Sequence, residues 1–350
     1  MITRQNAFHS RQTRCRPQDA TALSRRSILQ LFAALLAAPA VSRLAVARDT
    51  LRQVRVATGL LATWQSTAWL GAESGLFKKR GVDMTFPGIA VGGPQAAAGI
   101  VHGDWEFAHT GTLPVAEAVL KGQDIVILAT PTSEFADSFV MTRREITGLA
   151  QLSGKRVGIL TEMGQTSVAA QITVEKAGAT ATYVPLLTFE RIYAALTAGE
   201  IDAGALSIDL CYVGALRHGW NAFSINEFGT PSIFATSRKL IASNRDVVMR
   251  VMQVFLETIH LFKTRPDVVV PLLQRYLRIE DREAAEELHA LHVSVFQKVP
   301  RPSFPGMQTL RDLLAPKYSG AAFLKEPDIA DPSFVDELDQ NGFIEQLDVR

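Results

Sequence analysis

The stretch Gly154–Ser167, GKRVGILTEMGQTS, has the pattern of a buried strand, a polar loop and the start of a helix. Residues Val157 to Leu160 are apolar and partly β-branched, which is typical of a strand covered on both faces. Thr166 or Ser167 is expected to cap the next helix by accepting an orphaned backbone N–H. Open α/β sheets bind ligands where strands end and helices begin, and a helix amino end favours a negative group.

The same order of features occurs earlier in the chain. A strand at Val54–Thr58 leads through a polar loop to a helix expected over Thr67–Lys79 and to a strand at Val82–Phe86. A second pair of segments, His102–Gly111 and Ala198–Ser207, shares a helix-ending glycine, two acidic residues and a strand of small residues. Both repeats keep their order at a spacing of roughly 100 residues, which favours two similar α/β lobes.

The lobes are expected to exchange chain segments. We predict that residues 48–141 and 237–350 form the first lobe and that 142–236 form the second. The strand Ser138–Thr142 would leave the first lobe, and Ser232–Ser237 would return to it. The chain after this return is predicted to be mainly helical, because its apolar residues recur at three- and four-residue steps.

The amino-terminal segment, residues 1–47, has the features of an export signal. It holds seven Arg and one Asp, and a short apolar run at Ile28–Ala38 precedes an A-x-A cleavage site at Ala45–Ala47. Ser24–Leu29 resembles the twin-arginine motif, although Ile28 stands where Phe or Leu is usual; an ordinary Sec signal is the alternative. We therefore predict a periplasmic protein that is soluble and monomeric after signal cleavage.

Composition and motifs exclude several classes of protein. The chain after the signal holds 29 basic and 34 acidic residues, which gives no electrostatic case for nucleic-acid binding. The metalloprotease, dithiol, nucleophile-elbow and Walker A motifs are absent. Cys211 is the one cysteine left after signal cleavage, so it forms no internal disulfide and is expected to be a small buried residue.

Two sets of polar residues have a structural and a chemical interpretation. The acid pairs Asp104–Glu106 and Glu200–Asp202 could form catalytic dyads, but they precede strands and are expected to stabilise turns. His289 and His292 could bind a metal, but a third ligand is not evident. We predict no catalytic residue, metal or cofactor.

Four segments resemble the periplasmic solute-binding proteins of the nitrate, sulfonate and taurine ABC importer family. They occur in the family's order at Glu73–Asp83, Gly103–Ala108, Leu149–Gly158 and Ala194–Ala203. The resemblance covers roughly residues 52–300. It implies an α/β protein with the type 2 periplasmic binding protein fold, in which two α/β lobes are joined by two crossover segments. It also implies that lobe closure holds a small molecule and presents it to an ABC permease and its ATPase.

The ligand-binding residues are expected in loops at the carboxyl ends of strands. The ends of helices near Ser66 and Thr166 favour a small anion or organic acid. Asp209 could instead bind an amine, or cap the following helix, and Trp64 could stack on a ligand or lie in the core. Phe135 and Asp137 could also reach the cleft. The predicted ligand-binding residues are Trp64, Gln65, Gly92, Gly93, Thr110, Gly111, Thr112, Met163, Gly164, Gln165, Thr166, Ser207 and Asp209.

The resemblance leaves alternatives open. The same fold occurs in an iron-dependent thiamine-pyrimidine synthase, whose Cys-rich motif is absent here. LysR-type effector domains share the fold but follow a DNA-binding helix-turn-helix. A secreted hydrolase would need a nucleophile–base pair, which the sequence does not display. Nitrate, an alkanesulfonate, taurine, an aromatic acid and a thiamine precursor all fit the family as ligands.

Overall fold

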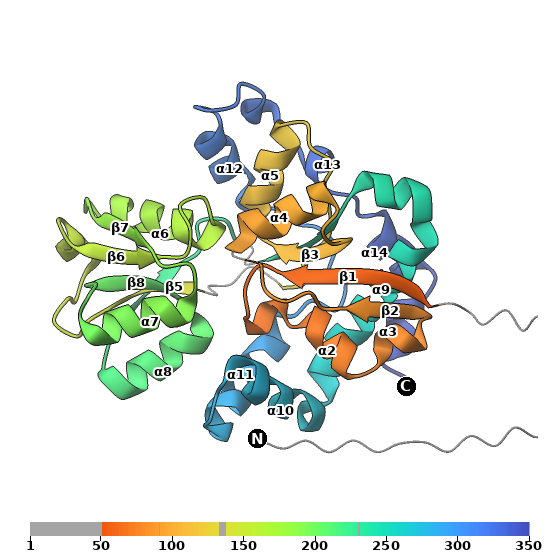
Figure 1. Ribbon diagram of the computed structural model, residues 1–350, viewed down its shortest axis with the longest axis horizontal. Helices are drawn as coiled ribbons and strands as arrows, with labels where there is room; N and C mark the ends of the chain where they lie inside the picture. Colours follow the sequence, from red (N-terminus) through yellow and green to blue (C-terminus); the bar gives the residue numbers. More distant parts are fainter. Residues whose placement is uncertain (1–50, 91, 133–137, 230–231, 350) are drawn as a thin grey trace, which may run out of the picture. The chain divides into compact units, whose positions relative to one another are not determined.

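The computed structural model describes residues 51–90, 92–132, 138–229 and 232–349 (Figure 1). The predicted export signal lies outside these residues, as do Phe135 and Asp137. Residues Asp49–Arg350 form one compact unit. Within the described part of the chain, no helix has the length and apolar character needed to cross a membrane.

The first of two five-stranded sheets has the order β2-β1-β3-β10-β4. Strands β1, β2 and β3 are parallel, and β10 runs antiparallel to both of its neighbours. All side chains of β3, β4 and β10 are buried, as expected for strands covered on both faces. The strands are β1 (Arg52–Thr58), β2 (Val82–Thr85), β3 (Phe107–Thr110), β4 (Val126–Ala129) and β10 (Ile233–Thr236).

The second sheet repeats this arrangement in the order β7-β6-β8-β5-β9. Strands β6, β7 and β8 are parallel, and β5 runs antiparallel to β8 and β9. Each sheet therefore has one antiparallel strand in the fourth position, which confirms the predicted α/β class with two similar halves. The strands are β5 (Ser138–Thr142), β6 (Arg156–Ile159), β7 (Thr182–Pro185), β8 (Ala203–Ser207) and β9 (Asn221–Ile225).

The antiparallel strands are the segments that we expected to cross between lobes. Strand β5 belongs to the second sheet and β10 to the first. Residues 138–141, which we placed in the first lobe, therefore pair within the second sheet, and residues 233–236 pair within the first. Each crossing strand completes the sheet that it enters, because an antiparallel partner satisfies the backbone groups of a strand that would otherwise be an edge.

Short helices follow the strands of both sheets. A glycine in the left-handed region, Gly75 with φ of 69°, breaks the expected helix Thr67–Lys79 in two. The helices of the first half are η1 (Thr63–Gln65), α2 (Thr67–Glu73), α3 (Leu76–Lys79), α4 (Gly92–His102) and α5 (Thr112–Leu120). Those of the second half are η2 (Leu149–Leu152), α6 (Gln165–Lys176), α7 (Phe189–Ala198) and α8 (Ile208–His218).

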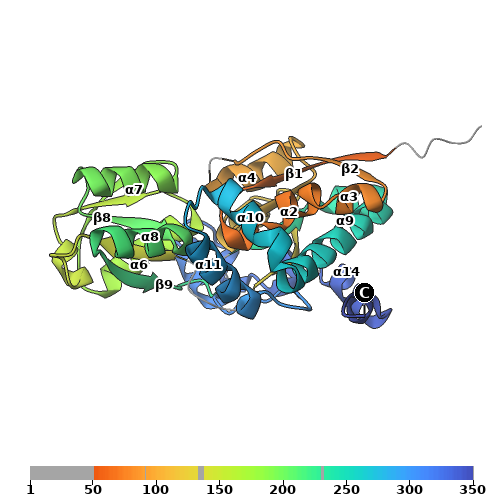
Figure 2. The same ribbon diagram turned by 90° about the horizontal axis from the view of Figure 1, so that it is seen from below.

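The remaining chain is helical, as predicted. Helices α10 and α11 pack against each other and against α9 (Figure 2). Helix α9 contains a kink at Asn244, whose φ of −157° and ψ of 51° are not helical. The elements are α9 (Arg238–Thr264), α10 (Pro266–Leu277), α11 (Arg282–Val295), α12 (Met307–Leu314), η3 (Ala321–Phe323), α13 (Glu326–Ile329), α14 (Ser333–Gln340) and α15 (Phe343–Leu347).

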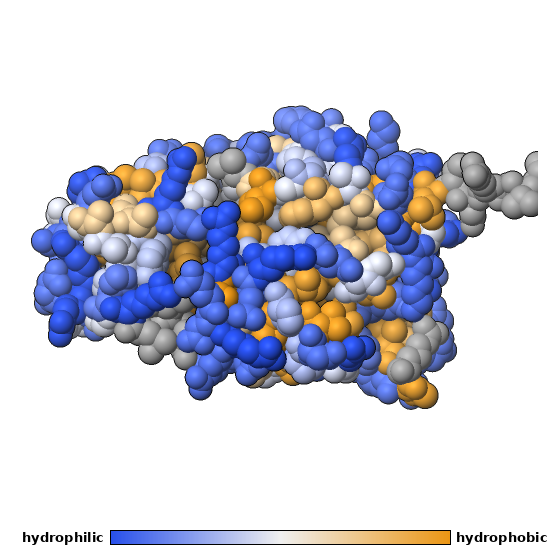
Figure 3. Space-filling view, turned by 60° about the horizontal axis from the view of Figure 1, so that its bottom comes forward, coloured by the Kyte–Doolittle hydropathy of each residue, from blue (hydrophilic) through white to orange (hydrophobic). Residues whose placement is uncertain are grey.

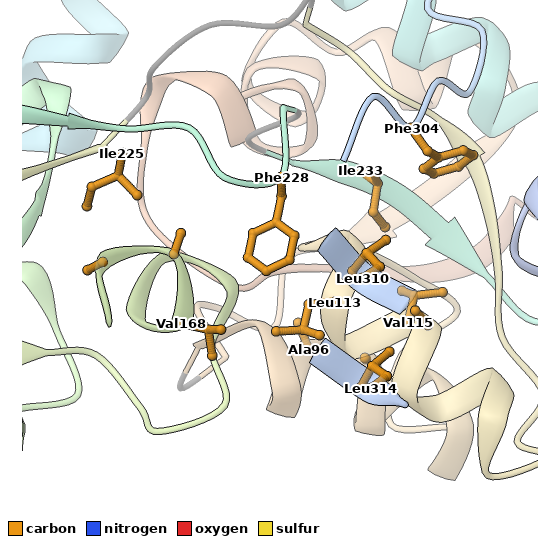
Figure 4. Packing of buried hydrophobic residues seen from close by; sticks show 14 of the residues in the cluster. Ala96, Leu113, Val115, Val168, Ile225, Phe228, Ile233, Phe304, Leu310 and Leu314 are labelled. Carbon is orange, nitrogen blue, oxygen red and sulfur yellow. The ribbon is translucent and has the colours of Figure 1, made fainter. Parts of the chain in front are cut away.

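One hydrophobic cluster contains side chains from both halves (Figure 4). Leu113 of α5 and Val168 of α6 belong to it, together with Phe228 from the segment between β9 and β10. Gly306 lies against this segment, and a Cβ there would be 2.4 Å from the Phe228 carbonyl oxygen. The crossing chain is thus packed on its way between the sheets.

Candidate ligand-binding site

Gln165 and Gly111 bring two of the predicted binding loops into contact. Gln165 is the first residue of α6, and its Oε1 accepts a hydrogen bond from the Leu113 backbone N–H at 3.2 Å. A Cβ at residue 111 would lie 2.8 Å from the Gln165 Cβ. Glycine therefore permits the amino end of α6 to approach the amino end of α5.

Seven of the predicted residues meet around a small space beside this contact. The space has a volume of about 20 Å³, which is enough for about one water molecule. The Gln65 Oε1 atom accepts the Leu60 N–H at 3.0 Å and so fixes the neighbouring loop. The predicted residues that line the space are Gln65, Gly92, Gly93, Gly111, Gly164, Gln165 and Thr166.

Asp209 makes a second contact between the halves. Thr63 Oγ1 donates to Asp209 Oδ1 at 2.6 Å, and the Thr63 backbone N–H approaches Oδ2 at 3.4 Å. Asp209 is only 5% exposed, and burial raises the pKa of its carboxyl group to about 6. Asp209 lies in the first turn of α8 and not at the N-cap position that we considered. Its carboxylate binds the side chain of Thr63, which belongs to the other half.

Ser207 and Asp209 line a much larger cavity, of about 740 Å³. Loop residues Leu61 and Ile89 border it, together with residues of α7 and α8 and of the turn between α10 and α11. Sequence reasoning missed the contribution of this turn, which is far from the predicted loops along the chain. Figure 3 shows the side of the molecule on which α10 and α11 lie, where apolar side chains appear between predominantly hydrophilic ones.

Four other predicted residues line neither space. Trp64 is fully buried and stacks on His292 with ring centroids 6.3 Å apart, which is the core position that we considered for it. Thr110 Oγ1 donates to the Gly93 carbonyl oxygen at 2.8 Å. Thr112 is buried at the start of α5, and Met163 is 40% exposed.

The helix caps differ from the prediction. Gly164 is the N-cap residue of α6, and its lack of a side chain leaves this position without a side-chain cap. Ser167 Oγ instead accepts the backbone N–H groups of Leu160 and Thr161, at 3.2 and 3.3 Å. The Ser167 hydroxyl group therefore fixes the loop after β6 and does not cap α6.

One acid of each predicted pair, Glu106 or Asp202, has a structural role and binds an arginine of the neighbouring strand. Glu106 accepts the Arg55 backbone N–H at 2.7 Å and pairs with its guanidinium group. Burial raises the Glu106 pKa, but the hydrogen bonds from Arg55 outweigh burial and lower it below the usual value. Asp202 likewise accepts the Arg156 N–H at 3.0 Å and pairs with Arg143 at 2.9 Å. These acids are occupied by structural partners.

The candidate metal residues also have structural roles. His289 Nε2 lies 2.7 Å from the Phe262 carbonyl oxygen, and His292 Nδ1 lies 2.7 Å from that of Leu288. No group of three or more potential metal ligands occurs among the described residues. Cys211 is buried, as predicted, and its Sγ lies 3.6 Å from the Leu206 carbonyl oxygen.

Two sheets of equal topology, joined by exchanged strands and touching through their strand-end loops, define the class of periplasmic binding protein folds. Solved structures agree. A protein from Bordetella bronchiseptica RB50 superposes with a TM-score of 0.71 at 14% identity, covering 84% of this chain and 98% of its own. The alkanesulfonate-binding protein SsuA from Xanthomonas axonopodis pv. citri, solved bound to MOPS, gives 0.65 at 17% identity, covering 80% and 98%.

The periplasmic nitrate-binding protein NrtA from Synechocystis PCC 6803 gives a TM-score of 0.67 at 10% identity, covering 83% of this chain and 89% of its own. No curated protein sequence matches the chain. The sequence profile of the family described as NMT1/THI5 like matches residues 66–268. Since this is more than half of the chain, the protein belongs to the NMT1/THI5-like family.

Proposed function

We propose that this protein is an exported solute-binding protein that captures a small organic acid between its two lobes. It would deliver this solute to an ABC permease and its ATPase, and it would act as a periplasmic monomer without enzymatic activity. The amino-terminal segment, with its paired arginines and short apolar run, supports export through the twin-arginine route. The family membership and the fold support the solute-binding role.

The observation that carries this proposal is the cavity of about 740 Å³ bordered by both halves of the molecule. Its volume is typical of sites for small organic molecules. The Thr63–Asp209 and Leu113–Gln165 hydrogen bonds join the halves on the two sides of the loops. Separating the halves would break these hydrogen bonds and part of the apolar cluster that the halves share, and it would open the cavity. This is how a hinged binding protein admits and releases a ligand.

A thermal-shift screen tests the proposal. The purified protein is heated with nitrate, alkanesulfonates, taurine, aromatic acids and thiamine precursors. A ligand at one hundred times its dissociation constant stabilises the folded state by about 2.7 kcal/mol. Small-angle scattering then shows whether the hit compacts the protein. A hit that is chemically converted, or the absence of any stabilising small molecule, contradicts a pure solute-binding role.

A further inference from the structure

The large cavity contains one buried charged group, and that group is acidic. Asp209 is 5% exposed, whereas the other charged residues lining the cavity are exposed. Among the described residues, Asp209 has no ion pair within 4.0 Å; its side-chain partner is the uncharged Thr63. A buried carboxylate without a cation costs free energy, which a positively charged partner would offset.

The hydrogen bonds of Asp209 leave room for such a partner. Oδ1 accepts the Thr63 hydroxyl at 2.6 Å, but the Thr63 N–H is 3.4 Å from Oδ2, beyond the usual range for a good hydrogen bond. The Asp209 carboxylate also interacts with its own backbone N–H. An ionised carboxylate accepts up to about four hydrogen bonds. A nitrogen cation in the cavity could therefore bind Asp209 while the Thr63 bond is kept.

Two arginines line the same cavity near its solvent-exposed rim. Arg217 belongs to the last turn of α8, and Arg278 follows α10 with a left-handed φ of 55°. Neither guanidinium group forms an ion pair with a described residue within 4.0 Å. Guanidinium groups bind carboxylate and sulfonate oxygens through paired N–H donors. The exposed part of the lining therefore holds two donors for an acid group, together with the acids Glu190, Glu280 and Asp281, while Asp209 is the buried acceptor for a cation.

Aromatic side chains form part of the wall of the same cavity. The hydroxyl group of Tyr193 bonds to His218 Nε2 at 2.9 Å, and that of Tyr276 donates to Glu73 Oε1 at 2.7 Å. Phe189 is buried beside them. Because hydrogen bonds hold both tyrosines in place, their rings offer a preorganised apolar surface, although the Tyr276 ring is also stacked on Trp69 with ring centroids 4.3 Å apart.

We propose that the solute is an organic zwitterion with an apolar or aromatic body, whose nitrogen cation binds Asp209 and whose acid group binds Arg217 and Arg278. This inference rests on the proposed function and specifies its ligand class. A bare inorganic anion would leave the Asp209 carboxylate buried and unpaired, and it would leave most of the cavity empty.

Compounds that share one skeleton test the inference. Phenylalanine carries both charges, 3-phenylpropanoate only the acid and 2-phenylethylamine only the amine; tryptophan, indole-3-propanoate and tryptamine form a second set. Calorimetry at up to 10 mM measures each dissociation constant. In at least one set we expect the zwitterion to bind ten times more tightly than the acid. Equal or tighter binding of the acid in both sets, or no binding of either zwitterion, overturns the inference.

Variants of the cavity assign the contacts. Asp209→Asn should weaken binding of the zwitterion at least tenfold and leave the affinity for the acid within twofold. Arg278→Gly keeps the left-handed backbone accessible and should weaken both acid-bearing compounds, but not the amine. Glu190→Gln is the matched control, because Glu190 is an exposed acid of the same cavity. Unchanged zwitterion binding in Asp209→Asn overturns the assignment.

The outcomes separate this inference from the proposed function. If nitrogen-free acids or anions bind and compact the protein while zwitterions do not, the inference fails and the solute-binding role stands. If neither these sets nor the wider screen gives a ligand, both fail. Circular dichroism melting of each variant confirms that a lost affinity reflects the cavity and not unfolding.

Discussion

The two contacts between the halves differ in what surrounds them. Around Gln165 and Gly111 the loops are in direct van der Waals contact, glycines replace side chains, and the remaining space is about 20 Å³. Around Thr63 and Asp209 a charged group is buried next to a cavity of about 740 Å³. The first region is built for close approach and the second for an occupant. This difference moves the expected ligand away from the glycine-rich loops and toward Asp209.

The largest expected effect concerns Asp209 beside the large cavity. It is a pH dependence of the free energy of unfolding. Burial raises the Asp209 pKa from 3.8 to about 6, so the folded state without ligand binds a proton that the unfolded state has released. The contribution of Asp209 protonation to the free energy of unfolding is complete below about pH 4, and it is lost as pH rises through about 6. This corresponds to about 3 kcal/mol at most. Asp209→Asn should remove that component.

Urea unfolding between pH 4 and 7 measures this component as the difference between wild type and Asp209→Asn. The difference should change by at least about 1.4 kcal/mol, which corresponds to one pKa unit. A difference that is constant over this range would show that Asp209 is not buried without a cation. Glu190→Gln, an exposed acid lining the same cavity, should show no such dependence.

The next effect concerns the contact between the loops around Gln165 and Gly111. Gly111→Val places a branched side chain where even a Cβ would be 2.8 Å from the Gln165 Cβ. Overpacking of this kind typically costs about 1–3 kcal/mol, and here separation of the loops can relieve it. We expect the variant to fold but to be more open, with an increased radius of gyration in small-angle scattering. Gly111→Val combined with Gln165→Gly removes the Cβ that the valine meets and should recover part of the closure relative to Gly111→Val alone, and the absence of recovery would contradict the assigned contact.

The topology and the structural acids were predictable from the sequence because they depend on local patterns. Two equal series of strands, loops and helices appear as repeats. The acids that precede β3 and β8 bind arginines of neighbouring strands, Arg55 within β1 and Arg156 at the start of β6. Caps were less predictable. Gly164 precedes Thr166 and Ser167 and begins α6 earlier, which leaves Ser167 to bind the loop after β6.

Contacts between the halves could not be read from the sequence. Thr63 and Asp209 are 146 residues apart, and their pairing depends on how two separately folded sheets meet. The turn between α10 and α11 could not be predicted as part of the cavity wall for the same reason, because its position also depends on how distant segments of the chain meet. The polar type of Asp209 signalled a possible site, but only the structure shows that its carboxylate is buried without a cation.

A smaller effect is expected for Gln165→Ala in the otherwise unchanged chain. The variant removes the acceptor of the Leu113 N–H, a hydrogen bond between the halves worth about 1 kcal/mol. Ligand affinity should fall about fivefold, mainly through faster dissociation, because the bond stabilises the closed state. Stopped-flow dissociation of any ligand found in the screen measures this. Gln171→Ala, on the same helix outside both cavities, serves as a control and should not change the rate. An unchanged rate of ligand dissociation in Gln165→Ala would mean that the contact of Gln165 with Leu113 does not contribute to closure.

The smallest expected effect tests whether any part of a ligand lies in the small space between the glycine-rich loops. Thr161 Oγ1 is buried beside the small space and has no hydrogen-bond partner among the residues that the structure describes. Thr161→Val keeps the shape and removes this hydroxyl group, so the free energy of unfolding should stay within about 1 kcal/mol or rise slightly. Ligand affinity should remain within twofold, because the solute occupies the Asp209 side. A tenfold loss of affinity with unchanged stability would instead assign the Thr161 hydroxyl to the ligand and would place the occupant between the glycine-rich loops.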